Sequence, residues 1–227
     1  MPPQVSMTPR EIKGRRLQRA LDHLAAADPD LGRAATQVGA PPPRARPAGF
    51  AGLLNILVAQ QVSAAAARAI WGRLVAGGPP TPVRFLAYDD ARLKAIGLSR
   101  QKIAYGRGLA ADVAAGRLDL DAVAALDDDA AIAALTRIKG VGRWSAEVYL
   151  LFCLQRPDVL PADDLALLVA AQRLKGYEQR PTAAGLRAAA EPWRPWRSVA
   201  ARLLWHYYSR APVEASPTAA AAGRPVL

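Results

Sequence analysis

Two glycines around one apolar residue, Gly140-Val141-Gly142, are the feature of this chain that most clearly predicts chemistry. They separate a predicted helix over residues 130–138 from another over residues 143–154. Glycine adopts the positive φ of a tight turn freely, and its bare N–H can approach a ligand closely. Val141 has the size to fill the gap between the two helices. The pattern predicts a hairpin of two helices whose turn faces a ligand.

Phosphate is the ligand that this turn suits. The N–H groups of Gly140, Gly142 and Ser145 would point outward at the N-terminal end of the second helix. The helix dipole there attracts an anion. Lys139 and Arg143 would add positive charge on either side of the turn.

A pair of aspartates, Asp163-Asp164, directly precedes a predicted helix over residues 165–174. Aspartates in this place usually cap the helix, and Asp163 is the expected cap. Asp164 would then lie beside the positive end of the helix dipole, which favours its ionised form.

The elements that would hold these residues are helical. Apolar residues recur at helical spacing, period-two alternation of useful length is missing, and the Pro-rich run 39–47 must be a loop. The chain is therefore predicted to be all-α, with about ten helices in two lobes. The expected helices begin at a capping box, Thr8-Pro9-Arg10-Glu11, and continue as 50–60, a segment capped by Ser63 and ended by Gly77, 82–88, 90–96, 100–115, 130–138, 143–154, 165–174, 182–190 and 196–208.

The composition favours a globular chain with a polyanionic partner. Of the 227 residues, 52% are hydrophobic, which is enough for a core and excludes wholesale disorder. The 25 Arg and 5 Lys outweigh the 19 Asp and Glu and give a net charge of +11. Such a charge points to nucleic acid or an acidic membrane face. An Arg-rich composition also follows from a GC-rich genome, so charge alone does not decide.

The expected compartment is a reducing cell interior. The only cysteine, Cys153, excludes an internal disulfide, a Cys-based zinc site and a four-Cys iron–sulfur cluster. Its apolar neighbours indicate a buried filler. The sequence has neither the layout of a signal peptide nor an apolar run of about 20 residues that could span a bilayer.

Three ordered motifs carry a resemblance to a known family. The hairpin LTRIKGVGRWSA (135–146) resembles the helix-hairpin-helix of the base-excision DNA glycosylase superfamily, in which an essential aspartate follows after a loop. VLPADDL (159–165) occupies that place. A second match, FxxLxxIxxxQQVS (50–63), lies upstream, and a third, WRPWRS (193–198) with LLW (203–205) after it, lies downstream. All three resemble the alkylpurine branch, the 3-methyladenine DNA glycosylase II (AlkA-type) proteins. The resemblance covers about residues 10–210.

The resemblance implies a role for each candidate residue. Asp164 would lie beside the C1′ of an extruded nucleotide, stabilise the cationic sugar, and orient or deprotonate water. Gln61 would be the wedge that fills the vacated base stack. Trp144, Tyr149 and Trp205 would line the pocket of the flipped base. The implied DNA contacts are Gln61, Lys139, Gly140, Val141, Gly142, Arg143 and Ser145.

The same resemblance separates two chemistries. Strand-cleaving relatives carry a lysine two places after the second hairpin glycine, whereas this chain has Trp144, which offers no amine nucleophile. We therefore expect a monofunctional enzyme that releases alkylated purines of the 3-methyladenine and 7-methylguanine type. No cofactor or metal is required by this chemistry. Relatives also suggest a monovalent cation at the hairpin carbonyls.

The implied architecture is a two-lobed glycosylase fold without the extra N-terminal α/β domain of longer relatives. The expected boundaries are 48–155 for the lobe with the hairpin (about 130–154), 8–47 plus 156–210 for the lobe with the catalytic aspartate, and 211–227 for a loose tail. Double-stranded DNA with alkylated bases is the expected partner, and no membrane. A monomer on the nucleoid of a bacterial cytoplasm is the expected setting.

Two positions depart from the family pattern. Val148 stands where a pocket aromatic is expected, which leaves the substrate range open. Glu147 replaces a neutral side chain and could bind the base, pair with an arginine or face solvent.

Other functions remain open at this point. The hairpin could be an ordinary turn, or it could grip duplex DNA in a protein without catalysis. A helical regulatory protein with a merely compositional charge would show no steep salt dependence of DNA binding. A strand-cleaving glycosylase for oxidised bases would form a covalent adduct that borohydride traps.

Overall fold

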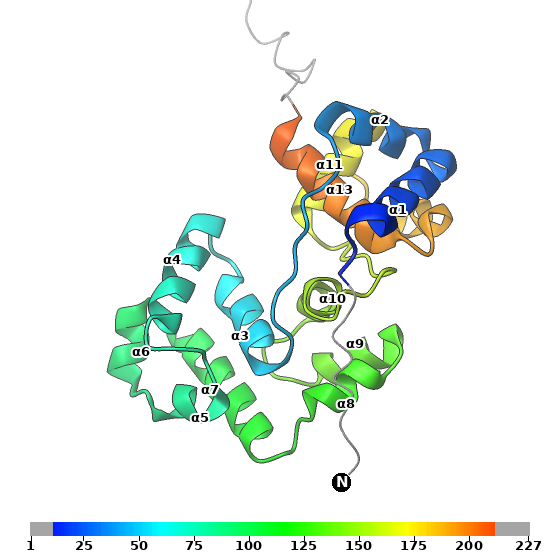
Figure 1. Cartoon of the computed structure of the whole chain (residues 1–227). Coiled ribbons are helices and arrows are strands. Elements are labelled where there is room, and N and C mark those ends of the chain that lie inside the picture. The colour runs from blue at the N-terminus through cyan, green and yellow to red at the C-terminus, as the bar shows by residue number, and fades with distance from the viewer. Residues whose placement is uncertain (1–10, 212–227) are drawn as a thin grey trace, which may run out of the picture.

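The computed structural model describes residues 11–211, and this part of the chain consists of helices and connecting loops without a strand (Figure 1). The predicted all-α class is confirmed. The helices are α1 (Gly14–Ala27), α2 (Pro29–Val38), α3 (Gly49–Ala59), α4 (Ala64–Val75), α5 (Pro82–Ala87), α6 (Asp90–Ile96), α7 (Arg100–Ala114), α8 (Leu120–Ala125), α9 (Asp128–Thr136), α10 (Arg143–Phe152), α11 (Leu165–Lys175), α12 (Ala183–Ala189), the short 3-10 helix η1 (Glu191–Trp193) and α13 (Arg197–Arg210).

The helices pack in two groups. One group contains α1, α2, α11, α12, η1 and α13, and the other contains α3 to α9. Helix α10 packs on α3 and α9, and Figure 1 shows it in the middle of the molecule, between the two groups. Residues 212–227 of the predicted tail lie outside the described residues. None of the described helices has the length and apolar character needed to cross a membrane.

The predicted start of the first helix is wrong. Residues 8–10 of the capping box lie outside the described part of the chain. Residues 11–13, which the capping box predicts to be helical, are not, and α1 begins only at Gly14, after an extended Lys13. Ile12 is buried in the core, and its carbonyl oxygen accepts a hydrogen bond of 3.2 Å from Arg202. This long-range contact holds the backbone extended where the local sequence favours a helix.

Two helices were not expected from the sequence. Helix α2 follows α1 after a single residue, Asp28, whose side chain accepts from the N–H of Asp30 while Pro29 takes the first helical position. Helix α8 is one short segment capped by Asp119. Both are short and lie within two residues of another helix, so apolar periodicity does not separate them.

The Pro-rich connector between α2 and α3 runs against the C-terminal end of α10. The Arg46 N–H donates to the Phe152 carbonyl at 2.9 Å, and the Gln155 amide donates to the Arg44 carbonyl at 3.2 Å. A side chain at Gly52 would meet the Pro47 carbonyl oxygen at 2.0 Å, so glycine is needed for this crossing. The connector therefore lies along the junction between the two groups of helices.

Candidate active site

The hairpin turn joins α9 to α10 and has the backbone that the sequence predicts. Gly140 has φ +90°, and a Cβ there would lie 2.3 Å from the Tyr105 ring. Val141 is buried and donates its N–H to the Ile138 carbonyl at 2.9 Å. Gly142 is the N-cap of α10 and brings no side chain to cover the first helical amides. The turn thus leaves the N-terminal end of α10 open to a ligand.

The charged residues beside the turn face solvent, whereas the serine does not. Lys139 and Arg143 are exposed, as the phosphate prediction requires. The Ser145 side chain is buried, and its hydroxyl accepts a hydrogen bond of 2.8 Å from Gln60. The predicted outward role of Ser145 can therefore rest only on its backbone N–H.

The turn between α3 and α4 lies against the hairpin. Gln60, to which the sequence analysis assigned no role, also donates to the Gly140 carbonyl at 3.0 Å. The next residue, Gln61, is exposed and has φ +53°. The two turns border a hollow of about 440 Å³ that Lys102 and Lys139 also line. The amide of Gln60 thereby joins the turn between α3 and α4 to the hairpin.

The acidic candidate lies across the junction, at the start of α11. Asp164 is the N-cap of this helix, and its Oδ1 accepts from the N–H of Ala166 at 2.9 Å and of Leu167 at 3.2 Å. The expectation that Asp163 caps the helix is wrong, since Asp163 instead pairs with Arg187 at 2.5 Å.

Two indole N–H groups point at the Asp164 carboxylate from different helices. Trp144 of α10 donates to Oδ2 at 2.9 Å, and Trp205 of α13 donates to Oδ1 at 3.0 Å. All three side chains are half-buried. The structure therefore brings together three residues that the sequence analysis placed in one site, and it fixes the carboxylate from three helices.

A third aromatic side chain, that of Phe152, lies beside this cluster, although the sequence gives it no role. The Phe152 ring stacks on Trp205 with centroids 5.4 Å apart and an interplanar angle of 27°. The guanidinium groups of Arg44 and Arg46 lie 5.3 and 5.4 Å from the Phe152 centroid. A small cavity of about 150 Å³ opens beside Trp205 and Phe152. Phe152 lies two helical turns beyond Trp144, and this spacing is the signal that could have identified it.

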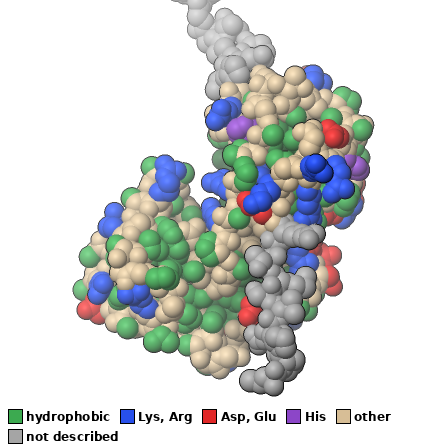
Figure 2. Space-filling model, viewed as in Figure 1, with side chains coloured by type: hydrophobic (Ala, Val, Ile, Leu, Met, Phe, Trp, Pro, Cys, Tyr) green, Lys and Arg blue, Asp and Glu red, His purple; other side chains and the backbone are tan. Residues whose placement is uncertain are grey.

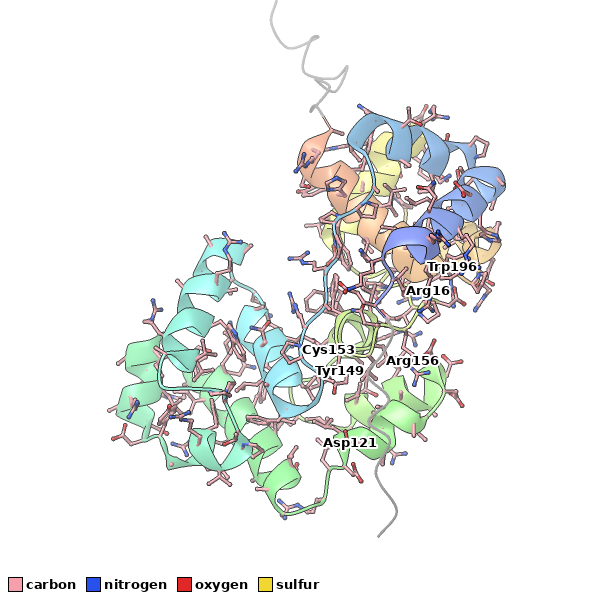
Figure 3. The ribbon with its side chains drawn as sticks, viewed as in Figure 1. Arg16, Asp121, Tyr149, Cys153, Arg156 and Trp196 are labelled. Atoms are coloured by element: carbon pink, nitrogen blue, oxygen red, sulfur yellow. The ribbon has the colours of Figure 1, made fainter. Side chains whose placement is uncertain are left out.

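The prediction that Tyr149 lines the base pocket is wrong. Its side chain is completely buried, and its hydroxyl oxygen accepts a hydrogen bond of 2.8 Å from the Gly49 N–H. Burial raises the pKa of Tyr149 to about 12. Figure 3 shows Tyr149 beside Cys153 in the interior of the molecule. Cys153 is buried as expected, and burial raises the pKa of its thiol to about 12.

Comparisons with known proteins agree with this arrangement. A family model described as "HhH-GPD superfamily base excision DNA repair protein" matches residues 54–195, which is more than half of the chain. DNA-3-methyladenine glycosylase 1 of Schizosaccharomyces pombe is 34% identical over 158 residues, which cover 67% of this chain and 69% of that protein.

Two solved structures share the fold. The 3-methyladenine DNA glycosylase Mag1 of S. pombe in complex with abasic DNA has a TM-score of 0.77 and 31% identity, over 82% of this chain and 95% of that chain. The DNA-3-methyladenine glycosidase of Bacillus halodurans has a TM-score of 0.72 and 30% identity, over 88% and 92% of the two chains. The chain belongs to the HhH-GPD superfamily of base excision DNA repair proteins.

Proposed function

We propose that the protein is a monofunctional DNA glycosylase that extrudes alkylated purines, of the 3-methyladenine and 7-methylguanine type, from duplex DNA and hydrolyses their N-glycosidic bond. The observation that carries this proposal is the Asp164 carboxylate held between the Trp144 and Trp205 indoles. The names of the relatives, which are 3-methyladenine glycosylases, support the substrate class.

The proposed chemistry needs one carboxylate. Alkylation at N3 or N7 makes a purine cationic, so that it departs as a neutral base and leaves a positive charge on the sugar. Asp164 stabilises that charge and orients the attacking water. Trp144 stands where a lyase would need an amine, so the reaction ends at hydrolysis. It requires no metal and no cofactor.

The proposed grip on DNA uses both turns. The hairpin amides and the exposed Lys139 and Arg143 hold a backbone phosphate. Gln61, at the tip of the neighbouring turn, enters the vacated stack, and the rings at the aspartate receive the extruded base. Figure 2 shows Lys and Arg side chains near the junction of the two groups of helices, which supports a polyanionic partner.

The partner that the proposal requires is double-stranded DNA with an alkylated base, bound by one copy of the chain. The site is built from a single chain, since α10, α11 and α13 supply its three central side chains. We place the protein on the nucleoid of a bacterial cytoplasm, where such a substrate would lie.

Base release from methylated DNA tests the proposal. We expect the native protein to release free 3-methyladenine, resolved by chromatography, and to leave an uncleaved strand with an abasic site. Borohydride should trap no covalent adduct, because Trp144 cannot form a Schiff base. DNA binding without release of any base would favour a non-catalytic hairpin module, and a trapped adduct would favour a strand-cleaving enzyme.

Replacing Gly140 with Ala should weaken DNA binding about tenfold or more, since several hairpin contacts depend on this turn. A side chain at φ +90° costs about 1–2 kcal/mol, and its Cβ would collide with Tyr105 and displace the turn. Fluorescence anisotropy with an abasic duplex measures the loss. Gly116→Ala is the matched control, because Gly116 also has a positive φ, of +70°, but open space around it. Native affinity in Gly140→Ala would contradict the proposed role of the turn.

A further inference from the structure

Glu147 is a buried carboxylate that the proposed reaction does not use. It lies on α10, one turn after Arg143, with 2% of its surface exposed. Its Oε1 accepts a hydrogen bond of 2.9 Å from the Arg143 Nε. Its Oε2 is buried and has no hydrogen-bond partner among the described residues. Because Glu147 engages Nε, the two terminal nitrogens of the exposed Arg143 are available to bind an anion.

A second guanidinium connects Glu147 to the loop that carries Asp164. The Arg187 Nη2 of α12 lies 3.6 Å from the Glu147 Oε1 and 2.5 Å from the Asp163 Oδ2. Asp163 directly precedes Asp164 in the chain. Charges of alternating sign therefore run from the hairpin to the aspartate loop through Arg143, Glu147, Arg187 and Asp163.

Burial of the charged Glu147 carboxylate is unfavourable for the stability of the fold. Burial raises the pKa of Glu147, although Arg143 and Arg187 oppose the rise, and Asp163 adds to it. A raised pKa means that folding favours the neutral form. The charge of Glu147 is thus less favourable in the fold than in water at neutral pH. A neutral residue of the same shape would suit the fold at least as well.

The ion pair between Asp28 and Lys175 provides the contrast. These side chains are 2.7 Å apart and also largely buried. Although burial opposes it, hydrogen bonds and charges from Asp28 and Asp30 raise the pKa of Lys175. The charge at that position is therefore favoured by folding, as expected of a pair that serves stability.

We propose that Glu147 is a positioning residue, which turns Arg143 toward the DNA phosphate and holds Arg187 against Asp163 so that Asp164 is fixed relative to the hairpin. This inference rests on the proposed function. Glu147 would keep the hairpin turn and the loop that carries Asp164 in a fixed position relative to each other. Of the three roles that the sequence leaves open for Glu147, the contacts therefore support pairing with an arginine.

The variant Glu147→Gln keeps the shape and an acceptor for Arg143 but removes the charge that holds Arg187. We expect its single-turnover rate of base release, with enzyme in excess, to fall about tenfold, and its melting temperature to stay level or rise. Arg187→Gln should slow the reaction similarly. The double variant should be no slower than the slower single variant, since both substitutions break the same connection.

Asp28→Asn is the matched control. It should lower the melting temperature and leave the rate at its native value, because Asp28 contacts Lys175, Trp193 and the Asp30 N–H, none of which belongs to the proposed site. A native rate in Glu147→Gln, or fully additive losses in the double variant, would overturn the inference. If the native protein releases no base at all, the proposed function fails. The inference is then tested by the affinity for an abasic duplex. Glu147→Gln should weaken that affinity about threefold, because Arg143 loses its charged partner. A native affinity in this variant would overturn the inference.

Discussion

Replacing Asp164 with Asn should slow base release by about a thousandfold while abasic DNA still binds. The amide has nearly the shape of the carboxylate, but it carries no charge to stabilise a cationic sugar. One of its two groups is also an N–H donor, which cannot accept from the indole that faces it. Both Trp144 and Trp205 donate to the native carboxylate, so one of them would lose its partner.

Single-turnover kinetics on methylated duplex DNA measures this loss, and anisotropy on an abasic duplex checks that binding survives. Asp119→Asn is the control for lost helix capping. Asp119 accepts from two backbone N–H groups at the start of α8, as Asp164 does at the start of α11, but it is exposed and has no indole partner. A similar rate in native protein and Asp164→Asn would remove Asp164 from the mechanism.

Substitutions at Trp205 should have the second-largest effect, and they separate the ring from its N–H group. Trp205→Phe keeps a ring that can stack on Phe152 but loses the bond to the Asp164 Oδ1. A hydrogen bond to a charged group contributes about 1.5–3 kcal/mol, so we expect a loss of about ten- to a hundredfold in rate. Trp205→Ala removes the stacking surface as well and should be slower still.

The rate at saturating enzyme and the apparent affinity for the lesion distinguish loss of the N–H hydrogen bond from loss of the stacking surface. The Phe variant should lose mainly rate, whereas the Ala variant should lose rate and affinity for the extruded base. Trp196→Phe is the control, because Trp196 lies beneath Arg16 at 5.6 Å, and the indoles that donate to Asp164 are those of Trp144 and Trp205. Equal rates in Trp205→Phe and the native protein would show that the indole N–H does not position the carboxylate.

The parts of this site that the sequence could predict depend on local geometry or on ordered motifs. The hairpin follows from two glycines around Val141, because the backbone conformation of a tight turn depends mainly on the residues within it. The meeting of Trp144, Asp164 and Trp205 depends on three helices that lie far apart in the sequence. Only the resemblance to a family placed these residues together.

The predictions for Tyr149 and Asp163 are wrong because the local sequence does not show which way each side chain points. Helix α10 is buried on nearly all sides from Ser145 to Phe152, so no polar face distinguishes its aromatic residues, and only the spacing from Trp144 indicates that Phe152 lies on the same side. The resemblance points to Tyr149, which the fold buries completely, whereas Phe152 packs against Trp205. Asp163 and Asp164 are adjacent and chemically alike, and a shift of one residue in the start of α11 exchanges the cap for the ion pair with Arg187.

Long-range burial explains the remaining difference. The sequence before α1 favours a helix, yet Lys13 is extended, and the carbonyl of the preceding Ile12 accepts a hydrogen bond from Arg202 near the other end of the described chain. Helix propensity contributes only tenths of a kcal/mol per residue, about 0.7 at most for ordinary residues, so one buried contact of this kind outweighs it.

A crystal structure of the native chain with duplex DNA that carries a cationic mimic of the abasic sugar would show whether Asp164 faces the sugar. We expect the mimic's positive nitrogen within about 4 Å of the Asp164 carboxylate. It also predicts Gln61 in the vacated stack and a phosphate on the amides of Gly140 and Gly142. A sugar bound away from Asp164, with the hairpin clear of the DNA backbone, would contradict it.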